Sequence, residues 1–232
     1  GGAYVDEDDS QALKEWDKKT VTEGWAAYSR VAWSPDSTQL IAVGPEDFTR
    51  GTALARMAMD NGLSFNADGY NWSQLIRGTL DASGDRLKVD WAPIPNTLRA
   101  VEAAWSPSGD TIAFSRYGDG THNLWTIGPE GAGAKQRTFF DDGTQIQGMS
   151  YVPDGSGLLL SLFHAHQQDL WFYDFATDSL RRLTDTPHVE TDPVVGPEGR
   201  AWFSSDLDGV FNVYSYVPTT GEVRRHTNLL GG

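Results

Sequence analysis

The chain has no cysteine and few basic residues. Of its 232 residues, 18 are Lys or Arg and 32 are Asp or Glu, so the formal net charge is −14. Without cysteine there is no disulfide framework, no thiolate zinc site and no thiol nucleophile. An acidic chain also lacks the basic face that nucleic acid and anionic membranes require. We therefore exclude thiol chemistry and expect no nucleic-acid partner.

Long hydrophobic runs and common enzyme motifs are also missing. No apolar run approaches membrane-spanning length and no signal peptide opens the chain, which predicts no transmembrane segment and either a cytosolic protein or one whose targeting segment has been removed. The sequence contains no Gly-x-Ser-x-Gly elbow, phosphate loop, His-Glu-x-x-His or dinucleotide fingerprint. Ser, His and Asp occur, but no spacing among them marks a triad. The balance favours a protein that is not an enzyme.

The chain does contain a repeated proline turn. Four segments, at 33–37, 105–109, 151–155 and 195–199, place an apolar residue two positions before a proline and a turn-forming residue after it. Proline presets φ for a tight turn, and the Asp, Ser, Glu and Gly that follow suit a reversal. Since a β-rich run follows each turn, every copy is predicted to be a β-hairpin.

The spacing of the turns predicts the fold. Their anchor residues are 72, 46 and 44 residues apart, and a period near 45 with four short strands is typical of a propeller blade. We predict an all-β propeller with four recognisable four-stranded blades. The first repeat is 26 residues longer than the second, which indicates an insertion with a short helix within 50–62. The predicted parts are an arm with an unpaired outer strand (1–28; strand 18–22), blade one (29–100; insertion 44–70), and blades two to four (101–140, 141–185 and 186–232).

The repeat resembles the TolB-type β-propeller repeat, a WD-like repeat with a Pro-Asp turn. The resemblance covers residues 18–228 and is carried by Trp-Ser-Pro at 105–107, Ile-Ala-Phe-Ser at 112–115, Asn-Leu-Trp at 123–125 and Arg-Arg-Leu-Thr at 181–184. That family usually closes with six or more blades. The chain is therefore expected to be a segment of a larger propeller, a processed product or a small propeller closed in an unusual way. We expect further blades, a partner chain or self-association to cover its ends.

The resemblance also implies a function. TolB-type proteins of the bacterial cell envelope suggest a non-catalytic module that docks a protein or peptide, in a periplasmic or extracellular location. The alternative is an enzyme-associated propeller, either a metal-dependent polysaccharide lyase or the substrate-gating domain of a prolyl-oligopeptidase-like or tricorn-like peptidase. Both interpretations stay open from the sequence.

Four histidines form a candidate divalent-metal site. His164 and His166 are two residues apart, and side chains at i and i+2 of an extended strand point to the same side. His122 falls at the corresponding loop of blade two and His188 in the link before blade four, so propeller topology places all four on one face. Imidazole with carboxylate suits Zn²⁺ or Mn²⁺, and TolB-like pectate-fragment lyases hold a metal through such histidines. The alternative is that these are exposed loop histidines; no other cofactor is predicted.

A docking surface is predicted on blade one. The insertion 44–70 and the link 91–96 are expected on the face shared by the second-to-third-strand loops and the inter-blade links. Their aromatic and apolar side chains are of the type that anchors interfaces. The alternative is that the insertion caps its own blade and buries them. The predicted anchors are Phe65, Tyr70, Trp72, Trp91 and Ile94.

Overall fold

The computed structural model describes residues 31–45, 73–83 and 88–230, which form sixteen strands and no helix. Within these ranges there is accordingly no helix long and apolar enough to cross a membrane. The predicted helix within 50–62 and the strand at 18–22 lie outside the described residues. The strands are β1 (Ala32–Trp33), β2 (Gln39–Pro45), β3 (Ser73–Asp81), β4 (Lys88–Pro93), β5 (Ala100–Trp105), β6 (Ile112–Gly118), β7 (Thr121–Ile127), β8 (Lys135–Gln136), β9 (Gln145–Tyr151), β10 (Gly157–His164), β11 (Gln167–Asp174), β12 (Ser179–Arg182), β13 (Glu190–Val195), β14 (Ala201–Ser205), β15 (Asn212–Val217) and β16 (Glu222–Arg225).

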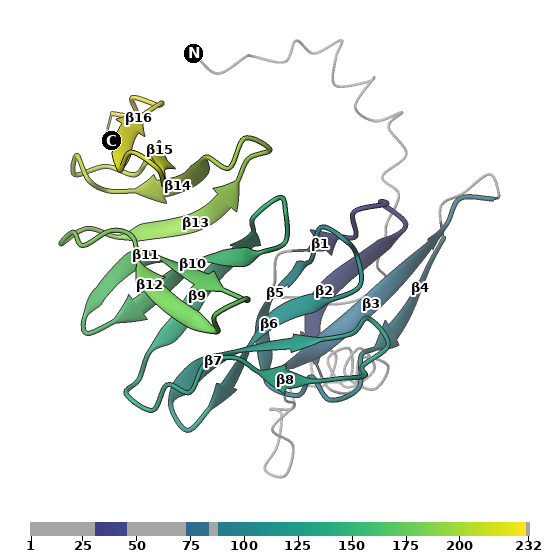
Figure 1. Ribbon diagram of the computed structural model, residues 1–232. Helices are drawn as coiled ribbons and strands as arrows, with labels where there is room; N and C mark the ends of the chain where they lie inside the picture. The colour runs from purple at the N-terminus through teal and green to yellow at the C-terminus, as the bar shows by residue number, and fades with distance from the viewer. Residues whose placement is uncertain (1–30, 46–72, 84–87, 231–232) are drawn as a thin grey trace, which may run out of the picture.

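Each group of four consecutive strands forms one antiparallel sheet, and the predicted all-β class with four-stranded sheets is confirmed. The four sheets follow one another as a fan, from the purple and blue sheet β1–β4 to the yellow-green sheet β13–β16 (Figure 1). The first strands of successive sheets lie next to one another: β1, together with β2, packs on β5, β5 packs on β9, and β9 packs on β13. This radial arrangement of sheets is that of a propeller.

Apolar layers between consecutive sheets hold the fan together. One layer joins the first two sheets and contains Ile41 and Phe114, and a second joins the next pair and contains Leu124 and Leu158. A third contains Leu159 and Phe203 of the last two sheets. Because both faces of the middle sheets are covered, β10 carries a nearly continuous apolar run rather than a strict alternation.

The four proline turns share one hydrogen-bond pattern. In the second turn, the Ser106 amide donates to the Thr111 carbonyl at 2.8 Å and the Gly109 amide donates to the Ser106 carbonyl at 3.0 Å. The first and third turns repeat both bonds, and the fourth is one residue shorter. The closing residue has positive φ in every copy; it is glycine in three turns and Ser37, with φ 59°, in the first.

The first sheet differs from the prediction at its outer edge. Residues 91–96 were predicted as a link, but β4 runs from Lys88 to Pro93 and therefore includes Trp91. Trp91 pairs with Gly78 of β3, and a Cβ on Gly78 would lie 2.8 Å from the indole ring. The glycine leaves room for the indole, so β4 continues to Pro93, which an edge strand tolerates.

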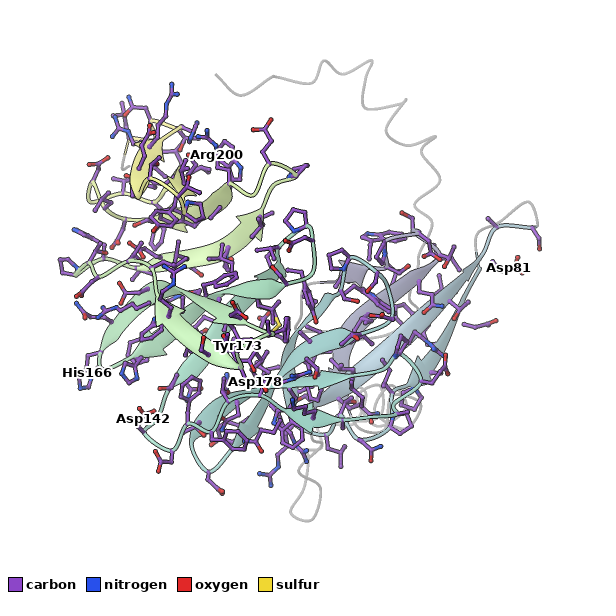
Figure 2. All side chains as sticks on the ribbon, in the orientation of Figure 1. Asp81, Asp142, His166, Tyr173, Asp178 and Arg200 are labelled. Atoms are coloured by element: carbon purple, nitrogen blue, oxygen red, sulfur yellow. The ribbon has the colours of Figure 1, made fainter. Side chains whose placement is uncertain are left out.

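Asp178 joins the second and third sheets through its carboxylate. It accepts hydrogen bonds from the Tyr173 hydroxyl at 2.7 Å, the Arg137 guanidinium at 3.0 Å and the Lys135 ammonium at 3.2 Å. Asp178 and Tyr173 are labelled close to each other in Figure 2. The bond from Tyr173, followed by those from Lys135 and Arg137, lowers the pKa of Asp178 to about 2. Tyr173 belongs to β11, whereas Lys135 and Arg137 lie in and beside β8. The ionised carboxylate thus stabilises the contact between two sheets.

The lowered pKa predicts an acid-dependent loss of stability. Because the folded-state pKa lies below the ordinary value of 3.8, Asp178 stabilises the fold above about pH 4, and this stabilisation is lost as the pH falls toward 2. We expect Asp178→Asn to lower the urea midpoint at pH 7 and to differ progressively less from the wild type between pH 4 and 2. A midpoint difference that stays constant over this range would contradict the prediction.

Candidate functional site

The first of the four predicted metal ligands, His122, is half-buried on β7. Its Nδ1 lies 3.2 Å from the carbonyl oxygen of Ile146, and its ring meets the ring of Tyr117 edge-on at 5.7 Å. Burial lowers the pKa of His122, partly opposed by the hydrogen bond to Ile146. The neutral imidazole is thus held between its own hairpin and the next sheet.

The second and third predicted ligands do not share the extended geometry that was expected. His164 ends β10, but Ala165 and His166 have φ of 50° and 67° and form the turn into β11. The same-side argument for residues i and i+2 is therefore wrong here. Nδ1 of His164 instead lies 2.9 Å from the Thr144 hydroxyl and 3.4 Å from the Asp142 carboxylate, while His166 is exposed in a loop at the lower left of Figure 2.

The fourth predicted ligand, His188, lies in the link before β13. Its Nδ1 is 3.7 Å from the Asp206 carboxylate, which also accepts the Val189 amide at 2.8 Å. Over the described ranges, no group of three or more His, Asp or Glu side chains is placed to hold a metal ion. The residues of this face that the structure describes therefore do not fit the metal centre that the resemblance implied.

The predicted docking anchors are only partly described. Phe65, Tyr70 and Trp72 lie outside the described residues. Trp91 is half-buried on β4, packed over Gly78. Ile94 is 2 % exposed and belongs to the apolar layer between the first two sheets, so it is a core residue and not a surface anchor.

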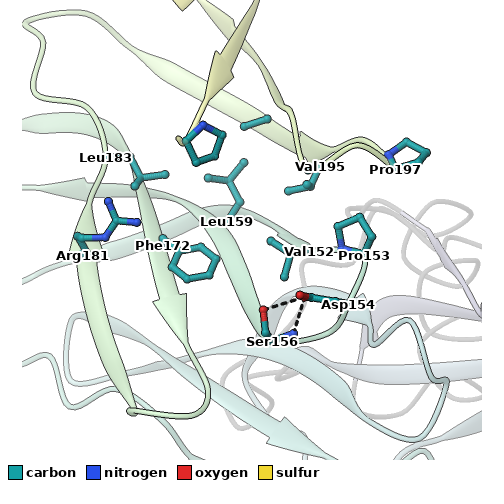
Figure 3. Close-up of a pocket in the computed structure, with 13 residues that line it drawn as sticks. Val152, Pro153, Asp154, Ser156, Leu159, Phe172, Arg181, Leu183, Val195 and Pro197 are labelled. Atoms are coloured by element: carbon teal, nitrogen blue, oxygen red, sulfur yellow. Dashed lines mark hydrogen bonds between the residues drawn. The ribbon is translucent and has the colours of Figure 1, made fainter. Parts of the chain in front are cut away.

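The structure reveals a pocket that the sequence did not predict. It has a volume of about 410 Å³ and lies between the third and fourth sheets (Figure 3). On one side, Leu159 and Phe172 are register partners on β10 and β11, and Arg181 of β12 continues the same row. On the other side lie Val195 and Ala201, themselves partners on β13 and β14. Most of the lining is apolar, and this volume falls within the range of ligand sites.

Prolines from three turns stand at the rim of this pocket. Pro153 and Pro197 come from the third and fourth copies of the repeated turn, and Pro218 follows β15. Pro197 and Pro153 are exposed, and both are labelled among the lining residues in Figure 3. Rigid pyrrolidine rings lose little conformational freedom on contact with a ligand. The rim is therefore a preformed apolar surface.

Two of the three polar lining residues bond to each other. The Asp154 carboxylate accepts the Ser156 amide at 3.0 Å and the Ser156 hydroxyl at 2.7 Å (Figure 3). These bonds lower the pKa of Asp154, so it is ionised at neutral pH. The third residue, Arg181, is exposed and its guanidinium lies 6.0 Å from the centre of the Phe172 ring. The pocket thus offers an apolar floor with one cation beside it.

The pocket lies on the face of the molecule opposite to the predicted one. It is reached from the repeated proline turns, whereas the docking surface was predicted among the second-to-third-strand loops. The proline repeat in the sequence indicates the turns but not the pocket beside them. The residues that line the pocket are spread from Val152 to Pro218 in the sequence, so no local sequence pattern predicts it.

The four radially packed sheets define a β-propeller. No family model matches the chain. Solved propellers do resemble it: TolB from Acinetobacter baumannii, with a TM-score of 0.56 and 19% identity over 85% of this chain and 42% of that one; an oligogalacturonate lyase in complex with manganese, with 0.59 and 19% over 85% and 52%; and a puromycin-hydrolyzing peptidase of Mycobacterium tuberculosis, with 0.60 and 16% over 91% and 31%.

These likenesses show the fold. The chain spans about half the length, or less, of these three proteins, and the identities are below 20%. The similarity extends over TolB, a lyase and a peptidase, so the same architecture serves unrelated activities. Function has to be argued from the site.

Proposed function

We propose that this propeller is a non-catalytic module that docks a protein or peptide, and that the pocket between the third and fourth sheets receives the partner. The supporting observation is the preformed apolar cavity of about 410 Å³ with its proline rim. Apolar anchors in a concave pocket contribute most of the binding free energy in peptide recognition. We further propose a periplasmic or extracellular location, on the resemblance to TolB-type proteins.

The two enzyme-associated alternatives require different features of the same fold. A metal-dependent lyase needs a ligand group that His122, His164, His166 and His188 do not form among the described residues. A gating domain of a peptidase would use the same pocket to capture peptides, and the likeness to a peptidase propeller is compatible with this. Peptide binding at the pocket is the property that the docking and gating functions share, so it is tested first.

A charge at the rim should abolish docking. We expect Pro197→Asp to remove binding to random octapeptides that are tethered by their N-termini. A bound apolar peptide would cover the new carboxylate and remove it from water, which costs free energy. Pro107→Asp is the matched control, since Pro107 occupies the same position in the second turn and does not line the pocket. Fluorescently labelled wild type and control should select the same apolar-rich peptides.

Two results would contradict the proposed function. One is a wild-type protein that selects no peptides above background. The other is a folded Pro197→Asp variant, with an unfolding temperature like that of the control, that selects the same peptides as the wild type.

A further inference from the structure

Arg181 is the one cation among the residues that line the pocket, and no ion pair engages its guanidinium in the described part of the chain. Asp154 and Ser156 satisfy each other, and neither bonds to Arg181. The neighbouring Arg182 on the same strand differs, because it pairs with the carboxylates of Asp169 and Asp185. The guanidinium of Arg181 lies over the Phe172 ring, 6.0 Å from its centre, and its N–H donors are left for a ligand.

The position of Arg181 restricts where an anion would bind. Arg181 is the register partner of Phe172, which is in turn the partner of Leu159, so cation and apolar floor form one row across the third sheet. In Figure 3 Arg181 and Asp154 lie on opposite sides of Phe172 and Val152. A negative charge therefore fits at the Arg181 end, and the Asp154 end disfavours a second one.

These features match a group that carries its anion next to an apolar side chain. We propose that the pocket binds the C-terminal residue of a peptide, with an apolar side chain over Leu159 and Phe172 and the α-carboxylate on Arg181. This rests on the proposed docking function and specifies its ligand. In a C-terminal residue the α-carboxylate and the side chain are attached to the same Cα, so the carboxylate can reach Arg181 while the side chain lies on the adjacent apolar floor. A guanidinium binds a carboxylate through two parallel hydrogen bonds.

The charge of the chain supports a ligand with a single carboxylate. At a net charge of −14, polyanions such as nucleic acids or acidic tails are repelled over the whole surface. A single carboxylate placed at Arg181 interacts mainly with the nearby guanidinium, because solvent and salt screen the more distant negative charges of the chain. Asp154, at the other end, favours a basic residue upstream in the same peptide.

The test compares a free with a blocked C-terminus. The probes are fluorescein-labelled Gly-Ser-Gly-Leu-Phe as the free acid and as the C-terminal amide, measured by fluorescence anisotropy against the full chain. We expect the free acid to bind about tenfold more tightly, as one charge-assisted contact predicts. Arg181→Gln should reduce the affinity for the free acid to that of the amide, while Arg181→Lys should keep part of the difference.

Arg224→Gln is the matched control, because Arg224 is likewise exposed on the fourth strand of its sheet but does not line the pocket. It should leave the preference for the free acid unchanged. One result would overturn the C-terminal inference but not peptide docking. In it, the wild type and Arg181→Gln bind the free acid and the amide equally well, and Pro197→Asp binds neither. Binding of neither probe, together with no selection from octapeptide libraries with free or amidated C-termini, would overturn both.

Discussion

Replacing Arg182 by methionine is expected to lower the free energy of unfolding by about 4 kcal/mol, because it removes the cation that pairs with a buried carboxylate. The Asp169 side chain is 2 % exposed and bonds to the Arg182 guanidinium and to the Thr186 amide. Methionine matches the length of the arginine stem but carries no charge. The buried Asp169 carboxylate would then keep one neutral donor, the Thr186 amide, in place of the cation.

A second buried acid increases this cost. Glu190 of β13 is 3 % exposed and accepts hydrogen bonds from the hydroxyls of Thr184 and Thr186. Burial is the main cause that raises the pKa of Glu190, and the charge of Asp169 adds to it. Without Arg182, the carboxyl groups of Asp169 and Glu190 would lie near each other in the interior without the positive charge of that side chain. The junction between the third and fourth sheets should therefore open first.

Urea unfolding at pH 7 checks this prediction, with Arg225→Met as the matched control. Arg225 also pairs with an aspartate, Asp208, but both side chains are more than 40 % exposed, so its removal should have a far smaller effect. The double mutant Asp169→Asn/Arg182→Met should recover about half of the loss, because the buried charge is gone. A double mutant as unstable as Arg182→Met would show that lost packing, and not the unpaired charge, is the cause.

Replacing Gly157 by alanine is expected to cost about 3 kcal/mol, because the new methyl group has no space. The added Cβ would lie 2.5 Å from the carbonyl oxygen of Tyr173 and closer still to the Phe172 ring. The first of these neighbours is backbone of β11, which cannot move without breaking its register with β10. The cost is therefore steric, and it does not arise from the φ angle of the glycine.

Gly118→Ala is the control for this substitution. Gly118 ends β6, has no heavy atom within 4 Å of an added Cβ and does not have positive φ. Its replacement should change the free energy of unfolding by less than about 0.5 kcal/mol. Because Phe172 lines the pocket, Gly157→Ala should also weaken peptide binding in any fraction that stays folded. Equal urea midpoints for the two variants would show that β10 and β11 separate easily.

Local sequence determined the class of the fold. The proline turns at 105–109 and 151–155 and the apolar runs after them are short-range signals, and they predicted the hairpins and the four sheets. Such signals suffice because turn geometry depends on a few neighbouring residues. They were less accurate at strand ends, as for β4, whose length depends on the contact between Trp91 and Gly78 across the sheet.

Tertiary structure decided where functional groups lie. His166 entered a turn instead of a strand, and Ile94, expected at the surface, became part of a core layer because it packs between two sheets. The pocket arises where Leu159 and Phe172 of one sheet face Val195 of the next without filling the space. Its existence depends on side-chain volumes from residues that are 23 to 36 positions apart in the sequence, and only packing brings these together.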